Sequence, residues 1–170
     1  RAYGLARMPA KTAEVLRGLS PRLFDQPMVV FGGTALFAYE LGAGVLASAR
    51  LVEDDHLILL TLGRDLHPNG ISAAYTATAG EDASMTRRGD RTIFRVPGFP
   101  PIEVWRTEYV LNHLDGDHLD VLRSALACKP VTGLTVARDG QPVEFRTLDV
   151  RTYAMAAQAL AGDGDALWAD

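Results

Sequence analysis

The sequence of 170 residues predicts a single domain of the α/β (α+β) class, in which helices pack on a mixed sheet. Short, continuous apolar runs indicate buried strands, and longer segments with apolar residues at helical spacing indicate amphipathic helices. The two kinds of segment follow one another without strict β-α-β alternation, which favours a mixed sheet over a purely parallel one. No internal repeat divides the chain.

The composition is that of an ordinary globular protein. Apolar residues make up 48% and charged residues 22% of the sequence, enough to bury a sizeable core. The formal net charge of −4 argues against a strongly basic nucleic-acid-binding module. Cys128 is the single cysteine, which excludes an intramolecular disulfide, and its helix-like neighbours predict a packed, inert thiol. Without a signal-peptide pattern or an apolar run near the roughly 18 residues of a membrane span, we expect a cytoplasmic protein with no membrane partner.

The first half of the chain predicts two short buried strands among helices and loops. In order, we expect a helix over 12–19 stopped by Pro21, a strand over Met28–Phe31, a helix over 34–41 ended by Gly42 and Gly44, a strand at 57–60 within 50–60, a loop over 63–70 and a polar loop over 80–90. The segment 73–78 fits either a strand or a short helix.

The second half predicts a strand pair, a helical stretch and a small C-terminal hairpin followed by a helix. The expected elements are strands over 91–96 and 102–105, helices over 107–114 and 119–127, strands over 131–137 and 143–145, and a helix over 150–161. Glu103 faces opposite to Ile102 and Val104 because side chains alternate along a strand. Asp139-Gly140 is a common two-residue hairpin signal.

The most informative stretch is the strand Met28–Phe31 with the Gly32-Gly33-Thr34 that follows it. Two glycines after a strand let the backbone approach a phosphate closely. The helix start beyond them offers unpaired N–H groups and the positive end of the helix dipole. Gly32, Gly33 and Thr34 are therefore candidate nucleotide-binding residues.

An acidic cluster precedes the second apolar strand about twenty residues later. Glu53, Asp54 and Asp55 stand directly before His56, and Glu103 lies on a later strand. Carboxylate oxygens are the ligands that magnesium (Mg2+) prefers, and magnesium usually shares them with substrate phosphates. Asp54, Asp55 and Glu103 are candidate metal ligands, and Asp54, His56 and Glu103 are candidate catalytic residues.

Residues 31–45, from Phe31-Gly32-Gly33 through Tyr39-Glu40 to Val45, resemble the first motif of a bacterial nucleotidyltransferase-like family. That family belongs to the DNA polymerase beta-type nucleotidyltransferase superfamily. A second segment, Asp139-Gly140 followed by 147–154, resembles the family's terminal "D-G … D-P-R-x-F-A" motif. The resemblance implies a nucleotidyltransferase-type mixed sheet with a core over about 22–106 and a C-terminal helical and hairpin part over about 107–170.

The family's first motif is followed by D-I-D-L-L, and this chain departs from that pattern. In one register Asp54 stands on the first aspartate and His56 on the second, where neutral imidazole is a poor magnesium ligand. In the other register Glu53 and Asp55 supply two carboxylates, but His56 falls on a leucine. The terminal motif of the family continues into a histidine and a lysine, and residues 155–158 contain neither.

Each of these candidates also has a plain structural interpretation. The acidic cluster can be a solvated loop, His56 can be bonded to backbone, and Glu103 can be a surface acid on an edge strand. Tyr39 and Glu40 can serve helix packing and exposure instead of substrate contact. The segment 113–118 holds two histidines and two aspartates at no standard zinc spacing, so we interpret it as a turn in which Asp117 caps the next helix.

The resemblance implies a protein that binds a nucleoside triphosphate with magnesium and transfers a nucleotidyl group to an unknown acceptor, whether RNA, protein or a small molecule. The departures favour an alternative, a catalytically inactive nucleotidyltransferase-fold module of the toxin–antitoxin or defence type. A structural domain of a larger protein is a third interpretation. All three depend on whether the diglycine and the acidic strand lie side by side.

Overall fold

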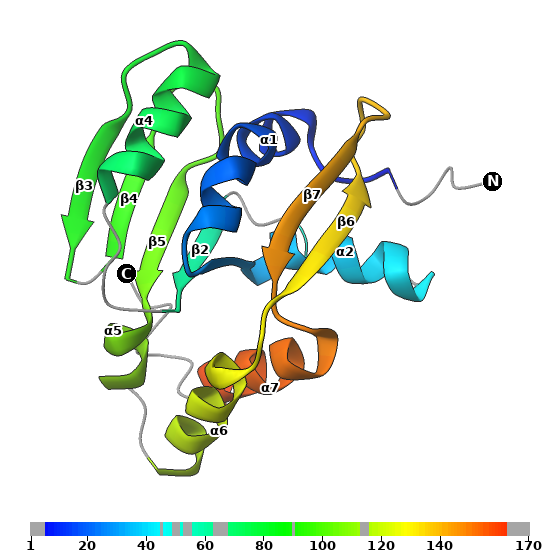
Figure 1. Ribbon diagram of the computed structural model, residues 1–170, viewed down its shortest axis with the longest axis vertical. Helices are drawn as coiled ribbons and strands as arrows, with labels where there is room; N and C mark the ends of the chain where they lie inside the picture. Colours follow the sequence, from blue (N-terminus) through cyan, green and yellow to red (C-terminus); the bar gives the residue numbers. More distant parts are fainter. Residues whose placement is uncertain are drawn as a thin grey trace.

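In the computed structural model, a mixed sheet carries helices on both faces, and a two-stranded hairpin lies beside it (Figure 1). The structure describes residues 6–44, 46–48, 52, 56–62, 68–89, 91–112 and 116–162. Within these residues the large sheet has five strands in the order β1-β2-β5-β4-β3, and β6 pairs with β7. The mixed α/β class predicted from the sequence is confirmed.

The large sheet combines one parallel pair with antiparallel neighbours. Its strands are β1 (Met28–Phe31), β2 (Leu57–Thr61), β3 (Ser84–Arg88), β4 (Arg91–Arg95) and β5 (Ile102–Arg106). β2 and β5 run parallel, because the chain between them passes through a helix and two further strands before it returns. The pairs β1–β2, β3–β4 and β4–β5 are antiparallel.

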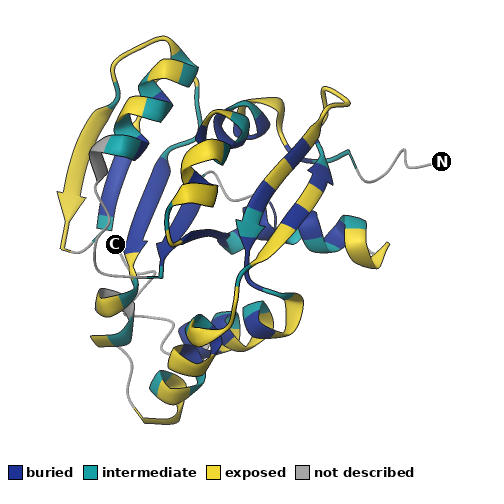
Figure 2. Ribbon diagram, in the orientation of Figure 1, coloured by how far each residue is buried: buried dark blue, intermediate teal, exposed yellow. Residues whose placement is uncertain are grey.

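The helices and the hairpin lie on defined sides of this sheet. Their bounds are α1 (Ala10–Asp25), α2 (Gly32–Ala43), α4 (Pro68–Ala79), α5 (Thr107–Asn112), α6 (Gly116–Ala127), α7 (Val150–Gly162), β6 (Val131–Val136) and β7 (Pro142–Thr147). α1, α2, α4 and β7 pack on the face that carries Leu59 and Val104. α6 and α7 pack on the opposite face, which carries Phe31 and Trp105. Figure 2 shows the resulting buried centre, in which each fully buried large apolar side chain contributes about 1.5–3 kcal/mol.

Several predicted elements are confirmed. The strands at 28–31, 57–60 and 102–105, the hairpin around Asp139-Gly140 and the C-terminal helix all appear. Glu103 does face opposite to Ile102 and Val104, since these two belong to one core cluster and Trp105 to the other. The segment 73–78, which fitted two interpretations, is part of α4.

Other expectations were wrong, and each has a physical reason. Pro21 does not stop the first helix: α1 continues to Asp25, because buried Leu19 and Leu23 keep packing on both sides of the proline. The stretch 80–90 is not simply a loop, because its residues 84–88 form β3, whose side chains are all exposed and show no apolar alternation. Residues 68–70 of the expected loop begin α4, and 63–67 lie outside the described residues.

Two local predictions near α6 were also wrong. Cys128 follows the end of α6 and is exposed, so its thiol is not a packed core group. Asp117 lies within the first turn of α6, which starts at Gly116, and is therefore not its N-cap. In the part of the chain that the structure describes, no helix is both long and apolar enough to cross a membrane.

Candidate functional site

The diglycine turn joins a buried strand to a helix, as the sequence predicted. All four residues of β1 are buried, and α2 begins directly at Gly32 with a φ of +65°. Glycine adopts this left-handed backbone conformation at far lower steric cost than any other residue. Gly33 and Thr34 follow in the first turn and are buried. No acidic side chain lies among the residues of this turn, so the helix start keeps its positive character.

Tyr153 on α7 holds the turn in place. Its hydroxyl donates a hydrogen bond to the carbonyl oxygen of Gly32 at 3.0 Å. Its ring packs against the rings of Phe31 and Tyr39, with centroid separations of 5.0 and 5.2 Å. The diglycine is thus held by a helix that is distant in the chain, since Tyr153 and Gly32 are 121 residues apart.

The start of α7 is itself anchored to the same region. Asp149 caps α7, since its carboxylate accepts hydrogen bonds from the backbone N–H groups of Arg151 and Thr152. The hydrogen bond from the Thr152 hydroxyl lowers the pKa of Asp149 below its ordinary value. Tyr39 donates its hydroxyl proton to the carbonyl oxygen of Leu148 at 2.7 Å, and burial raises the pKa of this phenol.

Tyr39 makes packing contacts, as the sequence favoured, and Glu40 is held by hydrogen bonds of its own. Glu40 is almost fully buried and accepts hydrogen bonds from the Arg7 guanidinium and from the backbone N–H of Ala47, each at 2.8 Å. These contacts tie α2 to the segments before α1 and after α2. Glu40 differs from the expectation only in being buried instead of solvent-exposed.

The strand registers place the diglycine turn at the end of the sheet where β2 and β5 begin. Phe31, the last residue of β1, pairs with Ile58, and Ile58 pairs in turn with Glu103. Because β1 runs antiparallel to β2, the chain leaves β1 into the diglycine beside the residues that lead into β2. His56 directly precedes β2 and is the residue of this stretch that the structure describes.

His56 and Glu103 form a direct pair. The Nδ1 atom of His56 lies 2.6 Å from Oε1 of Glu103. The second carboxylate oxygen, Oε2, accepts a hydrogen bond at 2.9 Å from the indole N–H of Trp105. Trp105 lies under the guanidinium of Arg91, whose central carbon is 4.6 Å from the ring centroid. The four side chains form a continuous row that runs from the residue before β2 across β5 to β4.

Two structural interpretations of this pair are overturned. Glu103 is not a surface acid on an edge strand, because β5 is the central strand and the carboxylate side chain is 10% exposed. His56 is bonded to a carboxylate and not to backbone. The sequence did not single out Trp105, Arg91 or Tyr153 for the site. A signal was present for Trp105, which stands two residues after Glu103 on a strand and therefore on the same face.

The described residues do not fit a magnesium site. Magnesium demands free oxygen ligands in near-octahedral geometry, whereas each oxygen of Glu103 is already engaged by a nitrogen atom, Nδ1 of His56 or the indole nitrogen of Trp105. Among the residues with described placement, no three His, Cys, Asp or Glu side chains gather as metal ligands would. The predicted ligands Asp54 and Asp55, and Glu53 of the alternative register, lie outside the described residues.

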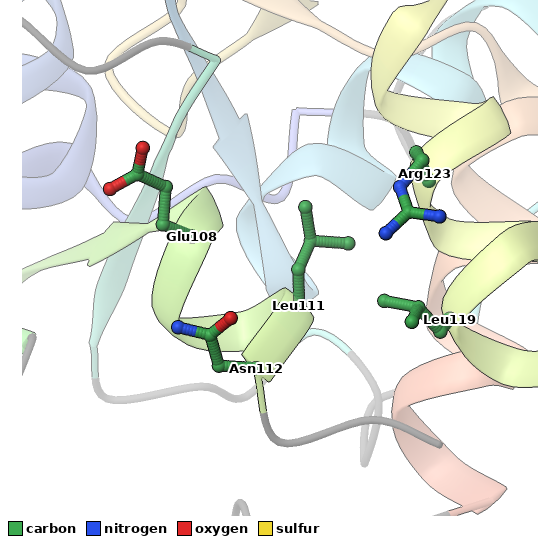
Figure 3. A pocket seen from close by; sticks show the side chains of 5 residues that line it. All are labelled: Glu108, Leu111, Asn112, Leu119 and Arg123. Atoms are coloured by element: carbon green, nitrogen blue, oxygen red, sulfur yellow. The ribbon is translucent and has the colours of Figure 1, made fainter. Parts of the chain in front are cut away.

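A surface hollow elsewhere contains none of the predicted site residues. It has a volume of about 510 Å³ and lies between α5 and α6 (Figure 3). It is lined by Glu108, Leu111, Asn112, Leu119 and Arg123. Because α5 follows the carboxyl end of β5, the hollow lies at the opposite end of the strands from the diglycine turn.

Comparisons of the chain with protein-family models, with curated proteins and with solved structures gave no match.

Proposed function

We propose that this chain is a nucleotidyltransferase-fold protein that binds a nucleoside triphosphate at the diglycine turn. One observation carries the proposal: the two segments that resemble the family's motifs, although far apart in sequence, contact each other. Tyr153 of the terminal segment donates its hydroxyl proton to Gly32 of the first. A chance likeness in two unrelated segments gives no reason for such a contact.

The chemistry of the turn supports a phosphate ligand. The left-handed Gly32 lets the backbone turn sharply from β1 into α2, and the described first turn of α2 carries no acidic side chain to compete with an anion. A helix start of this kind attracts phosphate through its N–H groups and its dipole. The position of Glu103, on the strand beside β2, is where the family resemblance expects the third acid.

The geometry favours nucleotide binding over metal-dependent transfer, because His56 and Trp105 already contact the two carboxylate oxygens of Glu103 that a metal would need. Transfer to an acceptor is the second candidate. Glu103 on the neighbouring strand favours it, together with the acids at 53–55, which would hold magnesium in an active member of the family. Magnesium would there neutralise the charge of the phosphates.

Calorimetric titration with ATP, GTP, CTP and UTP tests the binding proposal. We expect at least one nucleotide to bind with a Kd below about 1 mM, or roughly −4 kcal/mol. Gly32→Ala forces a side chain into the left-handed conformation, and we expect it to weaken binding at least about tenfold, or roughly 1.4 kcal/mol.

Gly42→Ala is the matched control, because a Cβ at that helical position has open space around it. It should leave affinity unchanged. If no nucleotide binds below about 1 mM, or if both glycine variants lose affinity equally, the proposal fails.

His56→Asp separates the two candidate functions. It replaces the ring beside Glu103 by a second carboxylate and restores the family's acidic pattern. We expect nucleotide affinity to become magnesium-dependent in this variant and not in the parent protein. A parent protein that already transfers a radiolabelled nucleotidyl group when magnesium is added would favour the transferase instead.

A further inference from the structure

We propose that Glu103 is a positioning residue that holds the imidazole of His56 against the bound nucleotide, and that it does not ligate a metal. This inference rests on the proposed function, since it names the group that meets the nucleotide beside the diglycine turn. The ligand class is a nucleoside triphosphate, and the contacting atom is Nε2 of His56.

The hydrogen bonds of Glu103 determine which ring nitrogen faces the ligand. An ionised carboxylate only accepts hydrogen bonds, so Nδ1 of His56 is the donor in the 2.6 Å contact. The indole N–H of Trp105 occupies the other carboxylate oxygen at 2.9 Å. Nε2 is then the nitrogen that remains for a ligand, on a side chain that is 37% exposed. Because the neutral ring carries no proton on Nε2, this atom accepts hydrogen bonds, so its partner on the nucleotide is a hydroxyl of the ribose and not a phosphate oxygen.

Burial fixes this arrangement. Glu103 is on the central strand with a side chain that is only 10% exposed, and Trp105 is 1% exposed beneath the Arg91 guanidinium. A buried carboxylate needs hydrogen-bond donors or a positive partner, and here two donors supply that need without a metal. A carboxylate that orients a histidine through Nδ1 also fixes its tautomer.

The position of His56 determines what its ring meets. The register pairs Phe31 with Ile58, so the residue two before Ile58 lies beside the start of the diglycine turn. His56 has the same strand parity as Ile58 and points to the face that carries Glu103. A nucleotide whose phosphates lie at the start of α2 therefore has the imidazole, directly before β2, as its neighbour.

Nitrogen-15 NMR of the histidine ring tests the positioning role directly. At a pH at which the ring is neutral, we expect the His56 signal, assigned with His56→Gln, to show Nδ1 protonated and Nε2 unprotonated. In Glu103→Gln the amide can accept from Trp105 only by turning its NH2 group toward His56, which switches the proton to Nε2. A parent protein with the Nε2–H tautomer, or a Glu103→Gln variant with no switch, overturns the role of Glu103.

Manganese, a paramagnetic substitute for magnesium, tests the metal half of the inference. As MnCl2 is raised to millimolar concentration, we expect the His56 ring signals of the nucleotide-free protein to broaden less than about twofold. A manganese ion bound beside the ring would broaden them much more. Broadening at micromolar manganese that disappears in Glu103→Gln would establish a metal on Glu103 and overturn the proposal, whereas broadening that persists in this variant comes from another ligand and leaves Glu103 a positioning residue.

Nucleotide affinity tests the contact itself. We expect His56→Gln and Glu103→Gln to weaken nucleotide binding about five- to tenfold, in EDTA as well as in magnesium. Glu144→Gln is the matched control, because Glu144 is exposed on β7, and it should bind as the parent does. Unchanged affinity in both site variants overturns the contact. If no nucleotide binds any form of the protein, the proposed function fails, whereas the tautomer and manganese results still decide the role of Glu103.

Discussion

The two edge strands of the large sheet, β1 and β3, are opposites in burial. Each has a single strand partner in the sheet. All four side chains of β1 are buried, whereas all five of β3 are exposed, and Figure 2 shows the exposed β3 at the rim of the sheet. The difference lies in what covers each edge. β1, which leads into the diglycine turn, is buried under other elements, whereas β3 is held mainly by its ladder with β4.

β1 is covered by the hairpin and by helices from distant parts of the chain. The hydroxyl of Thr147 at the end of β7 donates a hydrogen bond to the carbonyl oxygen of Val30 at 3.0 Å, and Tyr153 closes over Phe31. β3 instead presents Arg87 and Arg88. Charged side chains on an edge strand discourage pairing with another chain.

The largest contrast is expected from truncating one apolar side chain on each edge. Phe31→Ala removes a ring that is 3% exposed and leaves a cavity beside Tyr153, which should cost about 3–5 kcal/mol of the free energy of unfolding. Met85→Ala on β3 removes a side chain that is 48% exposed and should change stability by less than about 0.5 kcal/mol. Urea denaturation of both variants measures the two values. Equal losses would mean that β3 is as well covered as β1.

The contact between the hairpin and α2 is tested at Gly133. A Cβ added there would lie 2.7 Å from the Cβ of Ala38 and 3.3 Å from the methyl group of Thr147. Gly133→Ala should therefore cost about 1–3 kcal/mol through overpacking. Adding Ala38→Gly removes the closest contact, and the double variant should be less destabilised than the two single changes summed. Simple additivity in denaturation curves would show that β6 moves away from α2 without strain.

The brace on the diglycine turn is tested with Tyr153→Phe. The change keeps the ring contacts with Phe31 and Tyr39 and removes the hydrogen bond to Gly32. We expect a loss of about 0.5–1.5 kcal/mol in the free energy of unfolding, and weaker nucleotide binding because the turn is less well held. Calorimetry and denaturation on the same sample measure both effects. Loss of stability with unchanged affinity would separate the brace from the binding site.

The smallest effect is expected at the turn of the hairpin that covers β1. A hydrogen bond from Arg17 at 2.7 Å, helped by the backbone N–H of Gln141, lowers the pKa of Asp139 to about 2. The unfolded value is about 3.9, so the folded state gains stability that is present above that pH and is lost as the pH falls toward about 2.

Asp139→Asn has no such proton to bind. The stability difference between the parent protein and this variant should shrink as the pH is lowered from about 5 to about 2, and salt should reduce it because the pair is partly exposed. Chemical denaturation at several pH values measures the difference. A difference that stays constant over this range would mean that the pair with Arg17 does not stabilise the fold.

The apolar strands, the helices and the hairpin were predictable because burial and turn formation leave a local pattern in the residues of each element. Continuous apolar runs such as 28–31 predicted burial, and Asp139-Gly140 predicted a turn from local backbone preference alone. β3 was missed because Ser84–Arg88 has no apolar face, so only its ladder with β4 makes it a strand. Pro21 misled because packing of the neighbouring leucines outweighs a local helix break.

The same division applies to the site. The sequence by itself determined the diglycine turn and the side of its strand on which Glu103 lies, and it marked His56 and Glu103 as candidate residues. A turn conformation and the alternation of side chains along a strand are local properties, so neither needs the tertiary structure. Only the tertiary structure decided that His56 and Trp105 occupy the carboxylate of Glu103, and that Tyr153 holds Gly32. Strand order and register set those contacts, and both depend on how the whole chain buries its apolar faces.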